Sequence, residues 1–219
     1  INHGDLLLYL DVGCHLNKGG LKRLREYFQI LNENESGILA FQAKPPTADI
    51  SPLQYDGRKL FDQPNYKWVK GDLFDYFGVR DDKGYTHAQA IGAGVIFIKK
   101  CQQSVALVRE WQEIITQDFS LLDDTPSKSP NLEGFREHRH DQAIFSLLCL
   151  KHGVPTLSAY EYWYPKSAAL GRLEPAWDEL REFPIHAKRD KDLGLARNAI
   201  HKLRSLPSRL VNLTRRAFS

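Results

Sequence analysis

The stretch DLLLYLDVGC, residues 5–14, decides the fold. Its apolar run over 6–10 is short and unbroken, which is typical of a buried strand, and Asp11 with Gly13 ends it. A glycine pair follows, and apolar residues then recur at helical spacing over 21–31, with basic and acidic residues between them. The chain therefore opens as a strand, an acidic turn, a loop and a helix.

The same alternation continues along the chain. Further strands are predicted at 38–41, 90–98 and 154–157, helices near 66–77, 102–115 and 140–150, and loops at 44–64 and 118–136. Strands alternating with helices indicate an α/β domain with a mixed, mainly parallel sheet flanked by helices. In such sheets ligands bind outside the carboxyl ends of the strands, so Asp11 is a candidate functional residue.

Composition excludes several classes of protein. The chain has 219 residues, 42% of them hydrophobic and 26% charged, with a net charge of +3, which is an ordinary globular balance. The longest apolar runs are much shorter than the ~20 residues that cross a bilayer. The three cysteines are widely spaced, which argues against a disulfide framework or a thiolate zinc site. Because the chain has no methionine and starts just before a strand, we expect it to be a fragment.

The end of the chain differs from the rest. Residues 193–219 contain no Asp or Glu but repeated Arg and Lys, with leucines at roughly helical spacing. We predict a boundary here, with a domain over 1–192 and a basic amphipathic tail over 193–219. Such a tail can lie on an anionic membrane surface, or it can pack back on the domain with its charges in water.

Three short motifs carry chemistry. Asp11 after its strand offers a hard oxygen ligand for Mg²⁺ or Mn²⁺, or it simply caps the turn. Asp141, in HRHDQ at 138–142, falls in the first turn of a helix, where it could accept a proton from an attacking hydroxyl or act as a cap. The binuclear zinc-hydrolase pattern HxHxDH is not met, because Gln142 and Ala143 stand where Asp and His are needed.

The third motif is FPIHAKR at 183–189. His186, Lys188 and Arg189 could hold a metal and a diphosphate, or they could form a surface turn with solvated charges. Aromatic residues add a fourth feature: Trp68 and a cluster at 160–163 could stack on sugar rings, whereas Trp111 is predicted to be core.

The order of these motifs resembles the nucleotide-sugar-dependent glycosyltransferases of the GT-A fold. Asp11 stands where that fold places its DxD strand, and GAGVIF at 92–97 is similar to the strand that borders the donor sugar. Asp141-Gln142 resembles the later DQ helix start, and His186 with Lys188 resembles a late H-x-x-K element. The resemblance covers residues 5–189 and is strongest to bacterial transferases associated with surface polysaccharide.

The resemblance implies a GT-A-like Rossmann-type sheet that lacks its first strands. It implies transfer of a sugar from a nucleoside diphosphate sugar to a glycan or lipid-linked acceptor, in the cytoplasm or on the inner face of the membrane, with no nucleic-acid partner. The implied catalytic residue is Asp141. The implied donor-binding residues are Asp11, Gly92, Gly94, His186, Lys188 and Arg189. The implied acceptor-binding residues are Trp68, Lys70, His140 and Gln142. The implied ligands of Mn²⁺ or Mg²⁺ are Asp11 and His186.

One departure leaves alternatives open. Gly13 stands in place of the second Asp of DxD, so metal dependence is open. The same departure favours a degenerate module that binds a glycan or a partner without catalysis. A haloacid-dehalogenase-type phosphatase also places an Asp after an apolar strand, but it needs the second carboxylate. A nucleic-acid binder using the basic tail would show steeply salt-dependent affinity.

Overall fold

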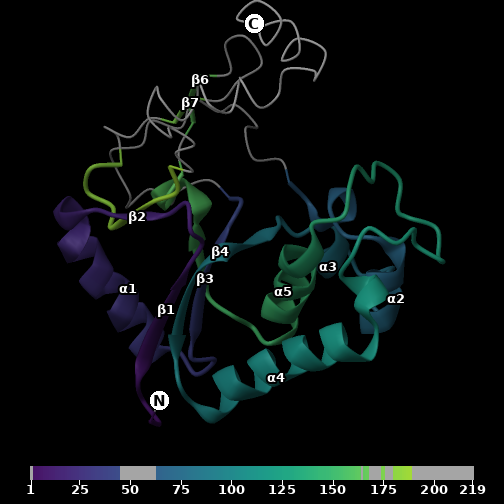
Figure 1. The fold of residues 1–219 in the computed structure, drawn as a ribbon, viewed down its shortest axis with the longest axis horizontal. Helices are drawn as coiled ribbons and strands as arrows, with labels where there is room; N and C mark the ends of the chain where they lie inside the picture. Colours follow the sequence, from purple (N-terminus) through teal and green to yellow (C-terminus); the bar gives the residue numbers. More distant parts are fainter. Residues whose placement is uncertain (1, 45–62, 164, 168–173, 176–179, 189–219) are drawn as a thin grey trace, which may run out of the picture. The chain divides into compact units, whose positions relative to one another are not determined.

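The computed structural model describes residues 2–44, 63–163, 165–167, 174–175 and 180–188 (Figure 1), all within a unit that spans Ile1–Lys188. The strands are β1 (Leu6–Leu10), β2 (His15–Leu16), β3 (Ile38–Gln42), β4 (Ile91–Lys99), β5 (Thr156–Ser158), β6 (Pro165–Ser167), β7 (Glu174–Pro175) and β8 (Ile185–His186). The α-helices are α1 (Leu21–Glu33), α2 (Gly71–Phe77), α3 (Lys83–Thr86), α4 (Gln102–Gln117) and α5 (His140–Lys151). Short 3₁₀ helices are η1 (Lys18–Gly20), η2 (Asn65–Lys67), η3 (Phe119–Leu121) and η4 (Ala159–Glu161).

The central sheet has the order β1-β4-β3-β5 and is mixed. β3 pairs parallel with β5, but β4 runs antiparallel to both of its neighbours. The predicted α/β class with a mixed sheet is confirmed, whereas the mainly parallel pairing is found only in part. The reason is that β4 begins at Ile91 beside Gln42, the last residue of β3, so the chain re-enters the sheet at the end it has just left.

A register shift interrupts the β3–β4 ladder. It falls between Leu39, which pairs with Phe97, and Phe41, which pairs with Gly92, so β4 carries extra residues at this point. Irregularities of this kind bend a strand and often lie beside functional sites. Here the shift includes Gly94, in the glycine stretch that the sequence marks as a donor-side element.

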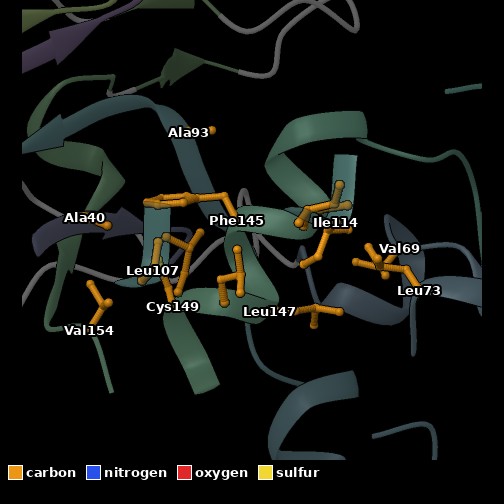
Figure 2. Close-up of a cluster of buried hydrophobic side chains, with 14 of the residues drawn as sticks. Ala40, Val69, Leu73, Ala93, Leu107, Ile114, Phe145, Leu147, Cys149 and Val154 are labelled. Atoms are coloured by element: carbon orange, nitrogen blue, oxygen red, sulfur yellow. The ribbon is translucent and has the colours of Figure 1, made fainter. Parts of the chain in front are cut away.

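One face of the sheet is covered by α4 and α5, with α2 and α3 beyond them (Figure 1). Apolar side chains fill this layer (Figure 2), and α5 contributes an unbroken buried run over 143–149. Trp111 of α4 stacks on Phe145 of α5 with ring centroids 4.8 Å apart, which confirms the prediction that Trp111 belongs to the core. This face therefore supplies most of the apolar burial.

The other face is covered by α1 and carries a buried charge. Tyr27 packs edge-on against Phe97 and Phe41 of the sheet. Its hydroxyl donates a 2.5 Å hydrogen bond to the buried carboxylate of Glu161, which also accepts two bonds of 2.8 Å from Arg23. These bonds fasten η4 to α1, and Tyr162 follows at the end of η4.

Most predicted elements are confirmed within a few residues. The expected burial of the strand over 6–10 is wrong, because β1 lies at the edge of the sheet and Leu6, Leu7 and Tyr9 are exposed. α4 begins at Gln102 as expected, and α2 ends where Gly78 adopts the left-handed conformation that favours glycine (φ +67°). The predicted loop at 44–64 lies mostly outside the described residues, as do Arg189 and the whole tail over 193–219. Among the helices that the structure describes, none combines the length and apolarity needed to cross a bilayer.

Candidate functional site

The end of β1 meets the glycine stretch of β4. The backbone N–H of Asp11 donates to the carbonyl oxygen of Gly94 at 2.9 Å, and the Asp11 side chain is exposed. A Cβ atom at position 94 would come within 2.6 Å of Asp11 Oδ2. The carboxylate therefore lies directly over the backbone of Gly94, which is bare because glycine has no side chain that would displace the carboxylate.

Tyr9 interacts with two of the predicted carboxylates, those of Asp11 and Asp141. Tyr9 donates a 3.2 Å hydrogen bond from its hydroxyl to Asp11 Oδ1. This bond, slight burial and the negative charges of Asp11 and Asp141 raise the pKa of the Tyr9 phenol. Asp141, in the first turn of α5, thus lies within electrostatic range of the same phenol as Asp11.

A second hydroxyl lies over β4 two residues before Gly94. A Cβ atom at Gly92 would come within 2.8 Å of the Tyr162 hydroxyl oxygen. Tyr162 packs edge-on against Phe41 at 5.2 Å, so its ring is held against the sheet. Both glycines of the predicted donor strand therefore face a polar group, a carboxylate at Gly94 and a phenol at Gly92.

His186 lies close to Asp11 in the fold, but its imidazole already has a hydrogen-bond partner. β8 pairs with β2, which places His186 opposite His15, four residues after Asp11. The imidazole is buried, and its Nε2 lies 2.8 Å from the carbonyl oxygen of Leu180, an acceptor to which it must donate. Burial chiefly lowers the pKa of His186, with the charges of Lys188 and His15 acting the same way. The imidazole is therefore neutral at neutral pH, and the charge of Lys188 favours this state.

The residues present do not form a metal site by themselves. Within the described ranges, no three His, Cys, Asp or Glu side chains are grouped so that they could hold an ion. Asp11 offers carboxylate oxygens, Gly13 offers no side chain, and Nε2 of His186 is directed at a carbonyl. A divalent ion would need most of its ligands from elsewhere.

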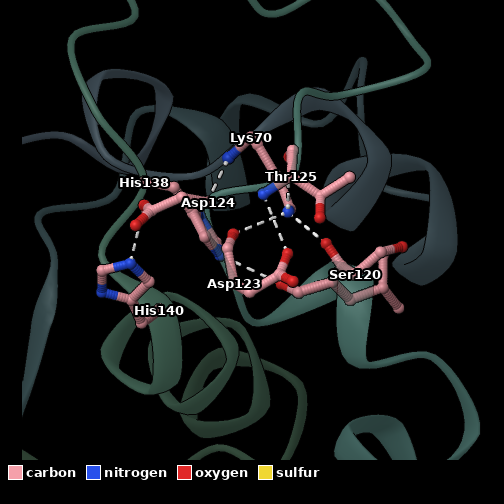
Figure 3. A network of polar contacts seen from close by, with 8 residues as sticks. Lys70, Ser120, Asp123, Asp124, Thr125, His138 and His140 are labelled. Carbon is pink, nitrogen blue, oxygen red and sulfur yellow. Dashed lines mark hydrogen bonds and ion pairs between the residues drawn. The ribbon is translucent and has the colours of Figure 1, made fainter.

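Lys70 has a different role from the predicted one. Its side chain is buried, and its ammonium donates to the backbone carbonyls of Ser120, Asp123 and Thr125, the last two at 3.0 and 3.2 Å (Figure 3). A buried ammonium needs such acceptors. With its donors used in this way, Lys70 fastens the segment after α4 and has no donor left for an acceptor sugar.

His138 helps to hold the same segment in place (Figure 3). Its Nε2 donates to the Leu121 carbonyl oxygen at 3.0 Å, while its Nδ1 accepts from the backbone N–H of Lys70 at 3.4 Å. Burial and the Lys70 ammonium lower the pKa of His138 to about 4. The imidazole is therefore neutral at physiological pH, as this pair of bonds requires.

The other predicted acceptor residues lie at the start of α5. His140 is exposed, has a positive φ of 44° and places Nε2 at 2.9 Å from Asp124 Oδ1. A non-glycine residue in this region is strained, and such strain often occurs at functional sites. Gln142 is half-buried beside Asp141. Trp68 is half-buried under the guanidinium of Arg139, which lies 4.3 Å from its ring centroid.

No protein family matches this chain, and a search of curated proteins and of solved structures likewise finds no match. The site must therefore be interpreted from its own chemistry.

The structure thus brings Asp11 and Gly94 together, with Tyr9 bonded to Asp11 and with Gly92 two residues before Gly94 on β4. Asp141 lies within electrostatic range of Tyr9. Sequence reasoning missed both tyrosines. Tyr9 falls within the unbroken apolar run over 6–10, and the only signal for Tyr162 was the aromatic cluster at 160–163. The arrangement provides one carboxylate that can orient a ligand and another that can accept a proton, beside backbone that allows close approach.

Proposed function

We propose that this protein is a glycosyltransferase that moves a sugar from a nucleoside diphosphate sugar to a glycan or lipid-linked acceptor. The observation that carries the proposal is the exposed Asp11 carboxylate, which accepts a hydrogen bond from Tyr9 beside side-chain-free Gly94. The negative charge of Asp141, which is also exposed, acts on the same phenol. The mixed sheet, with β1 ending at Asp11, supports the resemblance to the GT-A fold.

In the proposed reaction, Asp141 takes the proton of an acceptor hydroxyl as its oxygen attacks the anomeric carbon of the donor sugar. The bond from that carbon to the diphosphate breaks, and its electron pair leaves with the nucleoside diphosphate. Asp11 and the backbone at Gly94 position the donor, and Lys188 with Arg189 offsets the charge of the leaving group. Asp141 has this role as base if the anomeric centre inverts.

Dependence on Mn²⁺ or Mg²⁺ remains a prediction. Asp11 would be the protein ligand, and the ion would help neutralise the diphosphate. Because the described residues do not complete a metal shell, no step above depends on one.

A second candidate is a module of the same fold that binds a glycan or partner without catalysis. Gly13, which leaves Asp11 without a neighbouring carboxylate, favours it. The two candidates differ in a single observable, which is turnover of a nucleotide sugar.

The test is nucleotide release from UDP-glucose, UDP-galactose and GDP-mannose, with Mn²⁺ and without it, for wild type and Asp141→Asn. Loss of a positioned base should lower release by about 10²–10⁴-fold. Nucleotide affinity should stay unchanged, and the control Glu113→Gln, an exposed carboxylate on α4, should turn over normally. Release at the wild-type rate by Asp141→Asn would refute the role of Asp141, and no release by any protein would favour the binding module.

A further inference from the structure

A cleft that contains none of the residues around Asp11 is formed by another part of the fold. It has a volume of about 760 Å³ and lies between η2, α3 and the segment 132–136. This volume falls within the range of sites that hold small molecules or a few sugar units. Neither the sequence motifs nor the proposed reaction accounts for it.

Unbalanced positive charge lines the cleft. The guanidinium of Arg80 is compensated by Asp75, which it contacts at 2.5 and 2.8 Å, and by the Pro130 carbonyl. In the part of the chain that the structure describes, neither Lys83 nor Arg136 forms an ion pair with a carboxylate, and both are exposed. The cleft is lined by more basic than acidic residues: Lys67, Arg80, Lys83 and Arg136 are basic, and Asp81 and Glu133 are acidic. Cations without paired carboxylates attract an anionic ligand.

An aromatic wall adjoins these cations. Tyr66 is half-buried, and a Cβ atom at Gly134, where φ is +84°, would come within 3.1 Å of its ring. The ring of His87 lies 5.2 Å away at an angle of 51°. The Tyr66 ring therefore has bare backbone, an imidazole and the Lys67 ammonium, 5.6 Å from its centroid, as neighbours. A flat ring beside cations matches a ligand with an apolar ring face and an acidic group, which describes an acidic sugar.

Trp68 connects this cleft to the start of α5. The guanidinium of Arg136, in the cleft, lies 5.8 Å from the centroid of the Trp68 ring, and that of Arg139 lies 4.3 Å from the same centroid. The backbone N–H of Arg139 donates to the Trp68 carbonyl at 3.0 Å, and Asp141 follows two residues later. Trp68 thus contacts both a residue of the cleft and the segment that carries Asp141, the carboxylate proposed to deprotonate an acceptor.

We infer that this cleft binds an acidic saccharide, one that carries carboxylate or phosphate groups, and that it is the subsite for the acceptor. The second clause rests on the proposed function, whereas the first does not. Lys83 and Arg136 contact the acidic groups, and Tyr66 packs against a sugar ring.

The experiment is calorimetric titration with trigalacturonate, with maltotriose as its neutral counterpart, and with glucose 6-phosphate as the phosphate-bearing probe. We expect trigalacturonate or glucose 6-phosphate to bind about tenfold more tightly than maltotriose, because charge-assisted hydrogen bonds are the stronger ones. Whichever of these two acidic probes binds identifies the acidic group as a carboxylate or a phosphate. The double variant Lys83→Gln/Arg136→Gln should lose about tenfold in affinity. The control Lys22→Gln/Arg25→Gln, which removes two exposed charges from α1, should lose none.

Equal affinity for the acidic and neutral probes, no binding of any probe, or an unaffected double variant would overturn the inference. Tighter binding of a single-stranded oligonucleotide than of any saccharide would also overturn it. Nucleotide affinity of the double variant, measured in parallel, should be unchanged. If acidic saccharides bind but no nucleotide does, the proposed function fails while the cleft remains a saccharide site.

Discussion

Two polar clusters that the sequence predicted to serve one site differ in how their groups are satisfied. Around Lys70 and His138, each buried donor has a backbone acceptor, and the side chains hold the segment between α4 and α5. Around Asp11, the carboxylate accepts one phenolic hydrogen bond and is otherwise exposed, as is Asp141. The comparison teaches that Lys70 and His138 are occupied in holding the fold together, whereas the Asp11 carboxylate beside bare backbone is left accessible to a ligand.

The largest expected effect tests the first cluster. Lys70→Met should lower the free energy of unfolding by about 2–4 kcal/mol, because the Ser120, Asp123 and Thr125 carbonyls would be left without their donor. Urea denaturation measures this loss. The control Lys128→Met, an exposed residue of the same segment, should change stability by less than about 0.5 kcal/mol. A Lys70→Met protein as stable as wild type would contradict the structural role.

A smaller effect tests the second cluster. Gly94→Ala should weaken nucleotide binding about tenfold, because the added Cβ would lie 2.6 Å from Asp11 Oδ2 and the carboxylate must move away. Ala106→Gly, at an exposed position of α4, costs about 1 kcal/mol of stability and serves as a destabilised control with normal binding. Equal affinity in Gly94→Ala and wild type would show that Asp11 needs no bare backbone beside it.

The smallest effect sharpens the role of His138. Its pKa is about 4 in the folded protein against 6.5 when unperturbed, so between these values the unfolded chain binds a proton that the folded chain does not. Stability therefore rises with pH across this window and is lost as the pH falls from 6.5 toward 4. His138→Gln should show a weaker pH dependence of the melting temperature there. An identical slope in variant and wild type would refute this account of His138.

Local pattern made much of the fold predictable from the sequence. The apolar run at 6–10 and the helical spacing at 21–31 lie where β1 and α1 form. The direction of β4 was not predictable, because periodicity says nothing of the end at which a strand enters a sheet. The connection over 45–62 also gives no local signal for that direction.

Only part of the candidate site could likewise be predicted from the sequence. Asp11 and Gly94 were assigned to one site through the resemblance to the GT-A fold, because each motif alone is a weak signal. The burial of Lys70 could not be predicted, because its acceptors lie 50–55 residues further along the chain. Tyr9 gave no signal either, although Asp11 lies only two residues away, since Asp141 comes within electrostatic range of the phenol only in the folded chain.

The most direct test of the central claim is a titration of UDP, GDP and CMP, each with Mn²⁺ and without it, into wild type, Asp11→Asn and Lys70→Met. The last variant is measured at a temperature at which it is folded. We predict that one nucleotide binds wild type, that Asp11→Asn weakens this binding by about tenfold or more, and that Lys70→Met leaves it unchanged. Binding that is equal in Asp11→Asn and wild type, or that is lost in folded Lys70→Met, would contradict the assignment of the two clusters.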